Sequence, residues 1–407
     1  MDRRRLRDFD MGLLAAALAL VAVGIVMVYS ATRGAADASL SGLAQRQAVF
    51  AVLGLAALVG ALFVPQDTLE ILAPLLYGLA MALLVAVLFV GVGKMGERRW
   101  LDLGVLRFQP SELAKYAMIL LLARWLARKK TKLERATHLV VPIVITLIPF
   151  GLVLREPDLG TSLMFPLILL PMLYWAGARP VVILLLLAPA LSVVLAFHLV
   201  VWLVFLGALA CLLYLSRVLL TDKVVVFTAS VVAGRVSPLL WAHLEEYQRH
   251  RVLAFLSPEK YRFSTGYQLI QSKIAIGSGS AFGKGFLQGT QKNYAFLPEQ
   301  HTDFIFSVLG EEFGFLGCAV VLALYLYLVL RMLRLAAQAR NRFAGLVIVG
   351  IASMLFVQSA VNVGVTLGMS PVTGMPLPLL SYGGTSLLVT LGAIGVVLGM
   401  GIRRMEY

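Results

Sequence analysis

An acidic residue stands at the edge of the most apolar material in this chain. In LPEQHTDFIFSVLGEEFG, residues 297–314, Asp303 is followed at once by the apolar run FIF. A carboxylate at such a boundary can act as a general base toward an alcohol, or as a ligand of a divalent cation. We therefore take Asp303 as the candidate catalytic residue, and Thr302 before it as the predicted N-cap of a helix whose first turn contains the acid.

A second group of charges lies in GERRWLDLGVLRFQPSELAK, residues 96–115. Pro110 suits the first position of a helix, and Glu112 then lies in the first turn, where the helix dipole favours an acid. Lys115 follows one turn later on the same face. It is either a lysine whose amine reaches outward to the membrane surface or a cation at a functional site.

A third group lies in REPDLGTS, residues 155–162. Arg155, Glu156 and Asp158 crowd the start of another predicted helix, for which Pro157 suits the first position. An arginine in this place would suit a diphosphate. Candidate substrate-binding residues from these two stretches are Glu112, Lys115, Arg155, Glu156 and Asp158.

The stretch GMSPVTGMPLPLLSYGGTS, residues 368–386, contains three prolines that exclude a regular helix and a glycine pair that favours a turn. Irregular backbone at membrane depth is tolerated only where it is buried in protein or lines a wet cavity. Ser381 and Tyr382 offer hydroxyl groups there. With Thr302, they complete the predicted substrate-binding residues.

A glycine-rich run ends the stretch GYQLIQSKIAIGSGSAFGKGFLQGTQ, residues 266–291. Such glycines allow close backbone approach to a ligand, but they are more typical of a flexible loop or of a turn that follows the surface. No strand precedes the run and it has no Walker pattern, so we do not predict a nucleotide site.

The elements that must position these residues are membrane spans. The chain has 407 residues, of which 60% are hydrophobic and 14% charged. Several apolar runs reach about 20 residues, which is enough to cross a bilayer. This composition predicts an all-α polytopic membrane protein, with an uncleaved first helix rather than a removed signal peptide. Cys211 and Cys318 lie inside apolar runs and indicate neither a disulfide framework nor a metal site.

The apolar runs predict twelve spans, so both termini lie on one side of the membrane. Basic residues gather in short loops on the side of the termini, and the positive-inside rule therefore places the termini in the cytoplasm. The same distribution explains the formal net charge of +14 without a nucleic-acid partner. The predicted spans are 11–30, 47–64, 70–92, 111–127, 139–154, 161–177, 181–197, 199–215, 224–241, 312–333, 343–367 and 386–402.

This topology places four polar stretches on the outer side: residues 93–110, 155–160, 242–311 and 368–385. The longest, residues 242–311, begins with the amphipathic, basic segment WAHLEEYQRHRVLAFLSPEKYRF, which suits the membrane interface. We expect the four stretches to form a polar pocket at the mouth of an apolar groove. Such a pocket suits a substrate with a polar head and a lipid tail.

The motifs GERRWLDLGVLRFQPSELAK, REPDLGTS, GKGFLQGTQKNYAFLPEQHTDFIFSVLGEEFGFLG and PVTGMPLPLLSYGGTS resemble those of the SEDS family (shape, elongation, division and sporulation). They follow in the family's order across nearly the whole chain, and their wording is closest to the elongation branch. The resemblance implies a core of ten helices in one integral membrane domain, residues 1–407. The stretch between residues 180 and 241 is longer than the family implies, so we predict an inserted helical hairpin at 181–223.

The resemblance also implies a function. It implies a peptidoglycan glycosyltransferase that polymerises lipid II on the outer face of the bacterial cytoplasmic membrane, beside a class B penicillin-binding protein that crosslinks the glycan. The family's essential aspartate corresponds to Asp303, and its other motif positions to Lys115, Arg155 and Glu156. A divalent cation, magnesium or manganese, would be held at Asp303 if one takes part. The alternatives are a lipid II flippase and a noncatalytic scaffold for the penicillin-binding protein.

Overall fold

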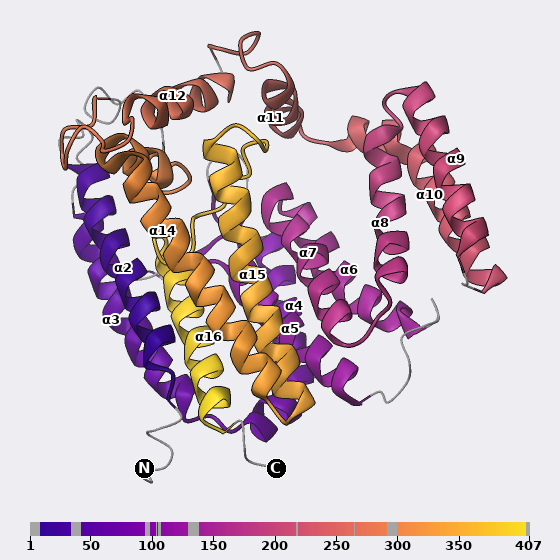
Figure 1. Ribbon diagram of the computed structural model, residues 1–407, viewed down its shortest axis with the longest axis horizontal. Helices are drawn as coiled ribbons and strands as arrows, with labels where there is room; N and C mark the ends of the chain where they lie inside the picture. Colours follow the sequence, from indigo (N-terminus) through magenta and orange to yellow (C-terminus); the bar gives the residue numbers. More distant parts are fainter. Residues whose placement is uncertain are drawn as a thin grey trace.

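The computed structural model describes residues 9–33, 42–93, 98–102, 104, 107–128, 138–216, 219–263, 265–290 and 299–403. Across these ranges the chain is a bundle of helices that run between two ends (Figure 1). The first helix of the bundle begins, and the last one ends, at the same end. This arrangement agrees with the even number of passes predicted from the sequence.

Each of the twelve predicted spans corresponds to a helix, so the all-α prediction is confirmed. The long helices are α2 (Met11–Thr32), α3 (Leu43–Leu62), α4 (Gln66–Val90), α5 (Pro110–Arg128), α6 (Val140–Arg155), α7 (Leu159–Trp175), α8 (Pro180–Leu195), α9 (Leu199–Leu215), α10 (Leu220–His243), α14 (Ile305–Gln338), α15 (Arg342–Thr366) and α16 (Gly384–Ile402). Among the described residues, α2, α3, α4, α10, α14, α15 and α16 are long and apolar enough to cross a membrane, and α6 to α9 are shorter apolar helices. The number of crossings stays a prediction.

Helix α15 lies in the middle of the bundle, where it packs against α14, α7 and α5. Small residues bring other helices into close contact. Gly399 and Gly395 of α16, four residues apart, face the backbone of α3 so closely that a Cβ at Gly399 would lie 2.6 Å from the Leu62 carbonyl oxygen. Contacts of this small-xxx-small type are a main source of helix association in a membrane.

Helices α8, α9 and α10 lie together at one edge of the bundle (Figure 1). Helix α8 ends at Leu195 and helix α9 begins at Leu199, so the two spans predicted at 181–197 and 199–215 are separate helices. The three helices share a polar seam, in which Trp202 Nε1 donates to Ser192 Oγ at 2.7 Å and Ser192 Oγ donates to the Ser230 carbonyl at 2.6 Å. The assignment of residues 181–223 as an insertion stays a prediction.

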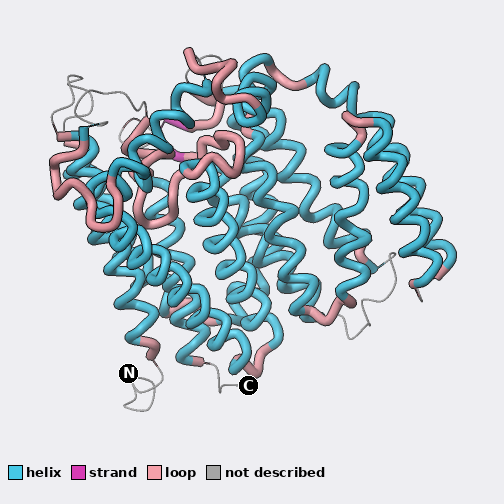
Figure 2. Tube along the Cα trace, turned by 45° about the horizontal axis from the view of Figure 1, so that its top comes forward, coloured by secondary structure: helices cyan, strands magenta, loops and turns pink. Residues whose placement is uncertain are grey.

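Loops and short helices crowd one end of the bundle (Figure 2). Helices α11 (Glu246–Leu256) and α12 (Thr265–Ser278) lie across this end, and a hairpin of β1 (Leu101–Asp102) and β2 (Arg107–Phe108) lies there too. Residues 367–383 are irregular, and most of residues 375–381 are buried. This burial satisfies the condition under which irregular backbone is tolerated at membrane depth.

The glycine-rich run packs against α14, which starts at Ile305, earlier than the predicted residue 312. The helix is broken at Gly314, whose φ of 64° and ψ of −162° form a backbone conformation that glycine adopts readily and other residues rarely do. At the break, the Lys284 amide donates to the Glu311 carbonyl at 3.0 Å, and the Phe315 amide donates to the Ser280 carbonyl at 2.9 Å. The glycines therefore allow the backbone of this run to lie close to the broken helix α14, as in a turn that follows a surface.

Candidate active site

The four polar stretches predicted to share one side meet in the structure. Arg99 links the first to the second, since its Nη2 donates to the Pro157 carbonyl at 2.6 Å. Tyr247 of α11 donates its hydroxyl to the same carbonyl and so joins the third stretch. The fourth is joined through Ser381, whose Oγ donates to the Thr302 carbonyl at 2.6 Å. The chain thus gathers its polar segments around Asp303.

Asp303 lies just before α14 and its backbone is held from two sides. Asn362 of α15 donates to the Asp303 carbonyl at 3.0 Å, and the neighbouring Thr302 carbonyl accepts from Ser381. Asp303 as a whole residue is half-buried. A Cβ at Gly374 would lie 3.8 Å from Asp303 Oδ2 and 3.6 Å from Arg251 Nη1, so the acid and this guanidinium face the same point of the irregular segment.

The pKa of Asp303 is raised. Its value goes from 3.8 to about 7, and burial of the carboxyl is the largest cause of this rise in pKa. The Arg251 guanidinium lowers the pKa, while the carboxylate of Glu299 raises it; Asp158 raises it and Arg99 lowers it by smaller amounts. At neutral pH the carboxyl is therefore divided between its acid and base forms, which is the range where a general base is most effective.

The predicted N-cap at Thr302 is wrong. Its hydroxyl turns back to the Glu299 carbonyl at 3.1 Å, and α14 begins two residues after Asp303 with no side-chain cap. The role of Thr302 in substrate binding stays a prediction, because its hydroxyl is engaged within its own turn.

Arg99, which was not among the predicted site residues, holds the REPDLGTS turn. Besides the bond to Pro157, its Nε donates to the Glu156 carbonyl at 3.3 Å, and its Nη1 lies 3.8 Å from Asp158 Oδ2. Arg155 is exposed in the last turn of α6. It remains a candidate for binding an anionic group, since its side chain can meet one from solvent.

Helix α7 begins at Leu159, and Pro157 lies before it with a φ of 27°, so the prediction that Pro157 starts this helix is wrong. Asp158 is the N-cap instead, because its Oδ1 accepts from the Thr161 amide at 3.0 Å and its Oδ2 from the Thr161 hydroxyl at 2.9 Å. The Asp158 side chain is therefore engaged by its own helix, and its substrate-binding role stays a prediction.

Glu156 is 1% exposed, and among the described residues neither of its carboxyl oxygens has a hydrogen-bond partner. Its pKa is raised to about 9: burial is the largest cause, the Asp158 carboxylate also raises the pKa, and Arg99 lowers it. The side chain is therefore neutral at pH 7. A neutral acid can donate one hydrogen bond to a phosphate or sugar oxygen, which keeps its predicted role in substrate binding open.

Replacing Glu156 with glutamine should make the protein less sensitive to alkaline pH. The folded state binds the Glu156 proton up to a pKa of about 9, while the unfolded chain releases it near 4.5. The folded state thus binds more protons in this window, and its stability falls as pH rises through it. The thermal midpoint of Glu156→Gln relative to the parent protein, measured in detergent, should rise with pH across this window. A constant difference would contradict the assignment.

Glu112 and Lys115 form an ion pair inside the bundle, on the face of α5 that the i, i+3 spacing predicts. Lys115 Nζ lies 2.7 Å from Glu112 Oε1, and the two side chains are 1% and 4% exposed. The same ammonium donates to Gln358 Oε1 of α15 at 3.2 Å. The lysine thus points into the protein rather than outward, and its role in binding substrate stays a prediction.

Ser381 and Tyr382 both connect the irregular segment to the Asp303 loop. Ser381 Oγ also accepts from the Leu377 amide at 2.8 Å, so this buried hydroxyl is engaged as donor and acceptor. The Tyr382 amide donates to the His301 carbonyl at 2.9 Å, and the two rings lie 5.9 Å apart. Contact of either hydroxyl with substrate stays a prediction.

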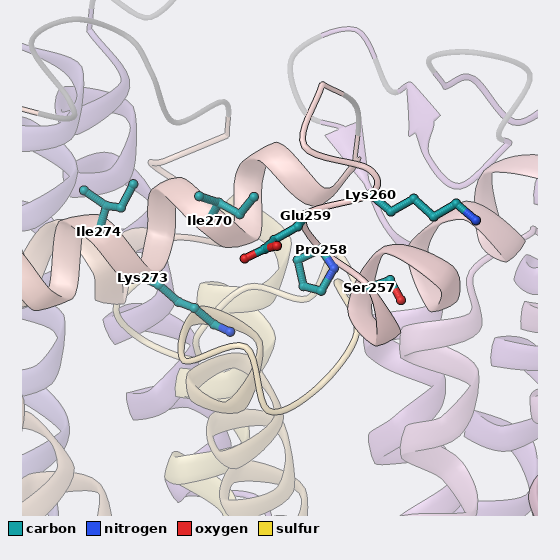
Figure 3. Close-up of a pocket in the computed structure, with 7 residues that line it drawn as sticks. All are labelled: Ser257, Pro258, Glu259, Lys260, Ile270, Lys273 and Ile274. Atoms are coloured by element: carbon teal, nitrogen blue, oxygen red, sulfur yellow. The ribbon is translucent and has the colours of Figure 1, made fainter.

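Two pockets open at this end. A small one of about 50 Å³ lies between the start of α7, helix α11 and residues 371–373, and Arg251 lines it. A wide one of about 670 Å³ lies between α12 and the chain that precedes it. Figure 3 shows Lys273 reaching from α12 toward the segment that follows α15, with Ile270 and Ile274 on the same helix. Two isoleucines, two lysines and the acid Glu259 thus lie together at the pocket.

Among the described residues, no three His, Cys, Asp or Glu side chains are grouped so that they could hold a metal ion. Magnesium in phosphate-transfer sites is commonly held by one or two carboxylates together with the substrate's own phosphates. Asp303 fits such a shared site as a single protein ligand. The predicted cation therefore stays a proposal that depends on the substrate.

Arg99, Arg251, Gln358 and Asn362 were missed as site residues. The two amides carried a signal, since FVQSAVNVGV places a glutamine and an asparagine four residues apart in an apolar span, where polar groups need internal partners. The sequence gives a weaker signal that the two arginines belong to the site. Arg99 follows another arginine, and Arg251 lies in a segment rich in charges that suits a membrane surface equally well.

Residues 11–208 and 199–405 match the model of the cell cycle protein family that comprises FtsW, RodA and SpoVE. The peptidoglycan glycosyltransferase MrdB of Escherichia coli is 37% identical, with 97% of this chain and 94% of that protein covered. A probable peptidoglycan glycosyltransferase FtsW of Geobacter metallireducens is 34% identical, with 99% and 97% covered.

A solved structure described as "Structural coordination of polymerization and crosslinking by a peptidoglycan synthase complex" is also similar. It has a TM-score of 0.73 and 32% sequence identity, and 98% of this chain and 99% of that chain are covered. The family resemblance drawn from the four motifs is confirmed. The chain belongs to the FtsW/RodA/SpoVE family, which is the SEDS family of polytopic membrane proteins.

Proposed function

We propose that this protein is a peptidoglycan glycosyltransferase that polymerises lipid II during cell elongation. One observation of the structure carries the proposal: Asp303, with a raised pKa of about 7, stands where four polar stretches meet. Relatives that cover nearly the whole chain are named as peptidoglycan glycosyltransferases. The sequence motifs favour the elongation branch.

The reaction joins two lipid-linked disaccharides. A sugar hydroxyl of the acceptor attacks the anomeric carbon of the donor, undecaprenyl diphosphate leaves, and an α-linkage becomes β. Asp303 takes the proton of the attacking hydroxyl, a role that contributes roughly 10²–10⁴-fold to the rate of such reactions. Negative charge develops on the leaving diphosphate and needs a cation nearby.

Arg251 is the cation best placed for this charge. It lines the small pocket and faces the same point as Asp303. The exposed Arg155 can meet a diphosphate from solvent, whereas Lys115 is engaged by Glu112 and Gln358. The pocket beside α12, with its lysines and isoleucines, suits an amphiphile that carries phosphate. The substrate's anchor then stays in the membrane that surrounds the apolar bundle.

The remaining parts of the proposal concern the location of the reaction, the orientation of the chain and its partner. Lipid II is polymerised at the outer face of the cytoplasmic membrane, with both termini of this chain in the cytoplasm and the four polar stretches outside. A class B penicillin-binding protein crosslinks the product as a partner. The similar structure is described as coordinating polymerization with crosslinking, which supports a partner of this kind.

Purified protein with labelled lipid II in detergent tests the proposal, with the products resolved by size. A polymerase yields glycan strands. A flippase forms no glycosidic bond and so gives no glycan, while detergent also abolishes any readout of flipping; a scaffold gives no glycan either. Absence of polymer under conditions in which the protein is folded and binds lipid II would remove the enzymatic proposal.

The rate of polymerisation should rise with pH through a midpoint near 7, because Asp303 must be ionised to act as a base and its pKa is about 7. Two single substitutions should move this midpoint in opposite directions. Arg251→Gln removes the cation that lowers the pKa, so the midpoint should rise. Glu299→Gln removes an anion that raises the pKa, so it should fall.

The measurement is the turnover of lipid II from about pH 5 to about pH 9, fitted for the midpoint and not for the height of the curve. The two variants control for each other, since each removes one charge beside the same carboxyl. Midpoints that move together, or a parent midpoint near that of an ordinary aspartate, would assign the titration to another group.

A further inference from the structure

Helix α15 carries two buried amide side chains one helical turn apart. Gln358 and Asn362 are each 1% exposed, in a helix whose other buried residues are mostly apolar. Burying an amide without hydrogen bonds costs on the order of 1–3 kcal/mol. Two such groups in the central helix therefore need a compensating role, and their contacts indicate which one.

Asn362 joins the acid to the irregular segment. Its Nδ2 donates to the Asp303 carbonyl at 3.0 Å and to the Met375 carbonyl at 2.8 Å. Both protons of the amide are therefore used, each on a backbone carbonyl of a segment without regular structure. Asp303 lies outside any helix, so this bond fixes its main chain where no helical hydrogen bond can.

Gln358 holds the next residue of the same segment. Its Nε2 donates to the Pro376 carbonyl at 2.9 Å, and its Oε1 accepts from Lys115, the lysine that is paired with Glu112. The irregular segment is thus bound to α15 at two successive carbonyls, those of Met375 and Pro376. The Glu112–Lys115 pair braces the second of them from α5.

We propose that Asn362 and Gln358 are positioning residues, which hold Asp303 and the segment around Gly374 in the geometry that transfers the glycosyl group. The inference rests on the proposed function, because it concerns the same site. Neither amide needs to touch the substrate, since both act through the backbone of other residues. A base displaced by about 1 Å can lose 10²-fold in rate, so loss of the Asn362 bonds should lower turnover far more than binding.

Asn362→Asp is the sharpest test, because it keeps the shape of the side chain but cannot donate to both carbonyls. Turnover of lipid II by the purified variant should fall about 10- to 100-fold, with KM within about threefold of the parent protein. The ascending limb of the pH profile should also move. The variant leaves the charges on Arg251, Glu299, Asp158 and Arg99 in place but adds a carboxyl beside Asp303, so the shift reports both the new acid and the altered distances.

Ser359→Ala is the matched control. Ser359 follows Gln358 on the same helix, is 6% exposed, and among the described residues its hydroxyl has no hydrogen-bond partner. Its removal should leave turnover and the pH midpoint unchanged. Any loss that Ser359→Ala shares with Asn362→Asp would mark a general effect of altering the centre of α15 and would overturn the inference.

Gln358→Glu is the second variant. Its carboxylate can still accept from Lys115 but cannot donate to Pro376, so turnover should fall while the bond to Lys115 persists. Parent-level turnover and pH midpoint in Asn362→Asp would overturn the inference. Should Asn362→Asp fail to fold, parent-level turnover in folded Gln358→Glu would overturn it. A parent protein that makes no glycan at all would instead reject the proposed function, so the two failures are distinct.

Discussion

The Asp303→Asn protein is expected to fold, to bind lipid II and to polymerise it about 10²–10⁴-fold more slowly than the parent. The substitution keeps the size of the side chain and the backbone bond from Asn362, which involves only the carbonyl. It removes the carboxyl whose pKa of about 7 suits a base at neutral pH. An amide cannot accept the proton of the attacking hydroxyl.

Three measurements separate this prediction from a structural effect. Binding of lipid II and the thermal midpoint should remain close to the parent values, while the initial rate of glycan formation collapses at every pH tested. Glu299→Gln is the matched control, since it neutralises an acid four residues earlier in the same loop and should keep its activity. Parent rates from purified Asp303→Asn would remove Asp303 from the mechanism.

The convergence of the four polar stretches was predictable because the chain offers few alternatives. In a sequence that is 60% hydrophobic, polar segments between spans must lie at one face or the other, and parity places these four together. Cap chemistry was predictable only where the local signal was unambiguous. Pro110 and Glu112 start α5 as expected, but Thr302 and Pro157 do not start their helices.

Those two errors have one physical origin. The preference for serine or threonine at an N-cap does not say whether the hydroxyl caps the next helix or forms a hydrogen bond within its own turn. The Thr302 hydroxyl does the second, since it donates to the Glu299 carbonyl. Near Pro157, Asp158 competes for the start of α7 and satisfies the Thr161 amide itself. In each case the choice depends on how the flanking loop is held by residues far away in sequence.

Long-range partners also decide which charges point inward. The lysine at 115 was equally consistent with reaching outward, because its acceptor Gln358 lies 243 residues further along the chain. The choice between Arg99 and Arg155 at the REPDLGTS turn depends on the packing of the β hairpin and α11 above it, which brings Arg99 to Pro157 and Tyr247. No local pattern contains that information.

Lys115→Met is expected to destabilise the protein by about 3–5 kcal/mol, the usual cost of breaking a buried ion pair from one side. Its partner Glu112 would keep a carboxylate that is 4% exposed. Among the described residues, Oε2 of Glu112 already has no hydrogen-bond partner. The midpoint of thermal unfolding in detergent should therefore fall sharply.

The double variant Glu112→Leu/Lys115→Met should recover most of that loss, because replacing a whole buried ion pair by hydrophobic residues of similar volume is often neutral or stabilising. A cycle of the two single variants and the double measures the coupling between the side chains. Losses that simply add would contradict the ion pair.

The stable double variant also decides the role of Lys115 in substrate binding. If the lysine contacts the diphosphate, the affinity for lipid II should fall although the fold is restored. If it acts only by bracing Gln358, affinity should remain and turnover alone should fall, as in Gln358→Glu. We expect affinity to remain and turnover alone to fall, because the Lys115 side chain is 1% exposed and its ammonium is bonded to the side chains of Glu112 and Gln358.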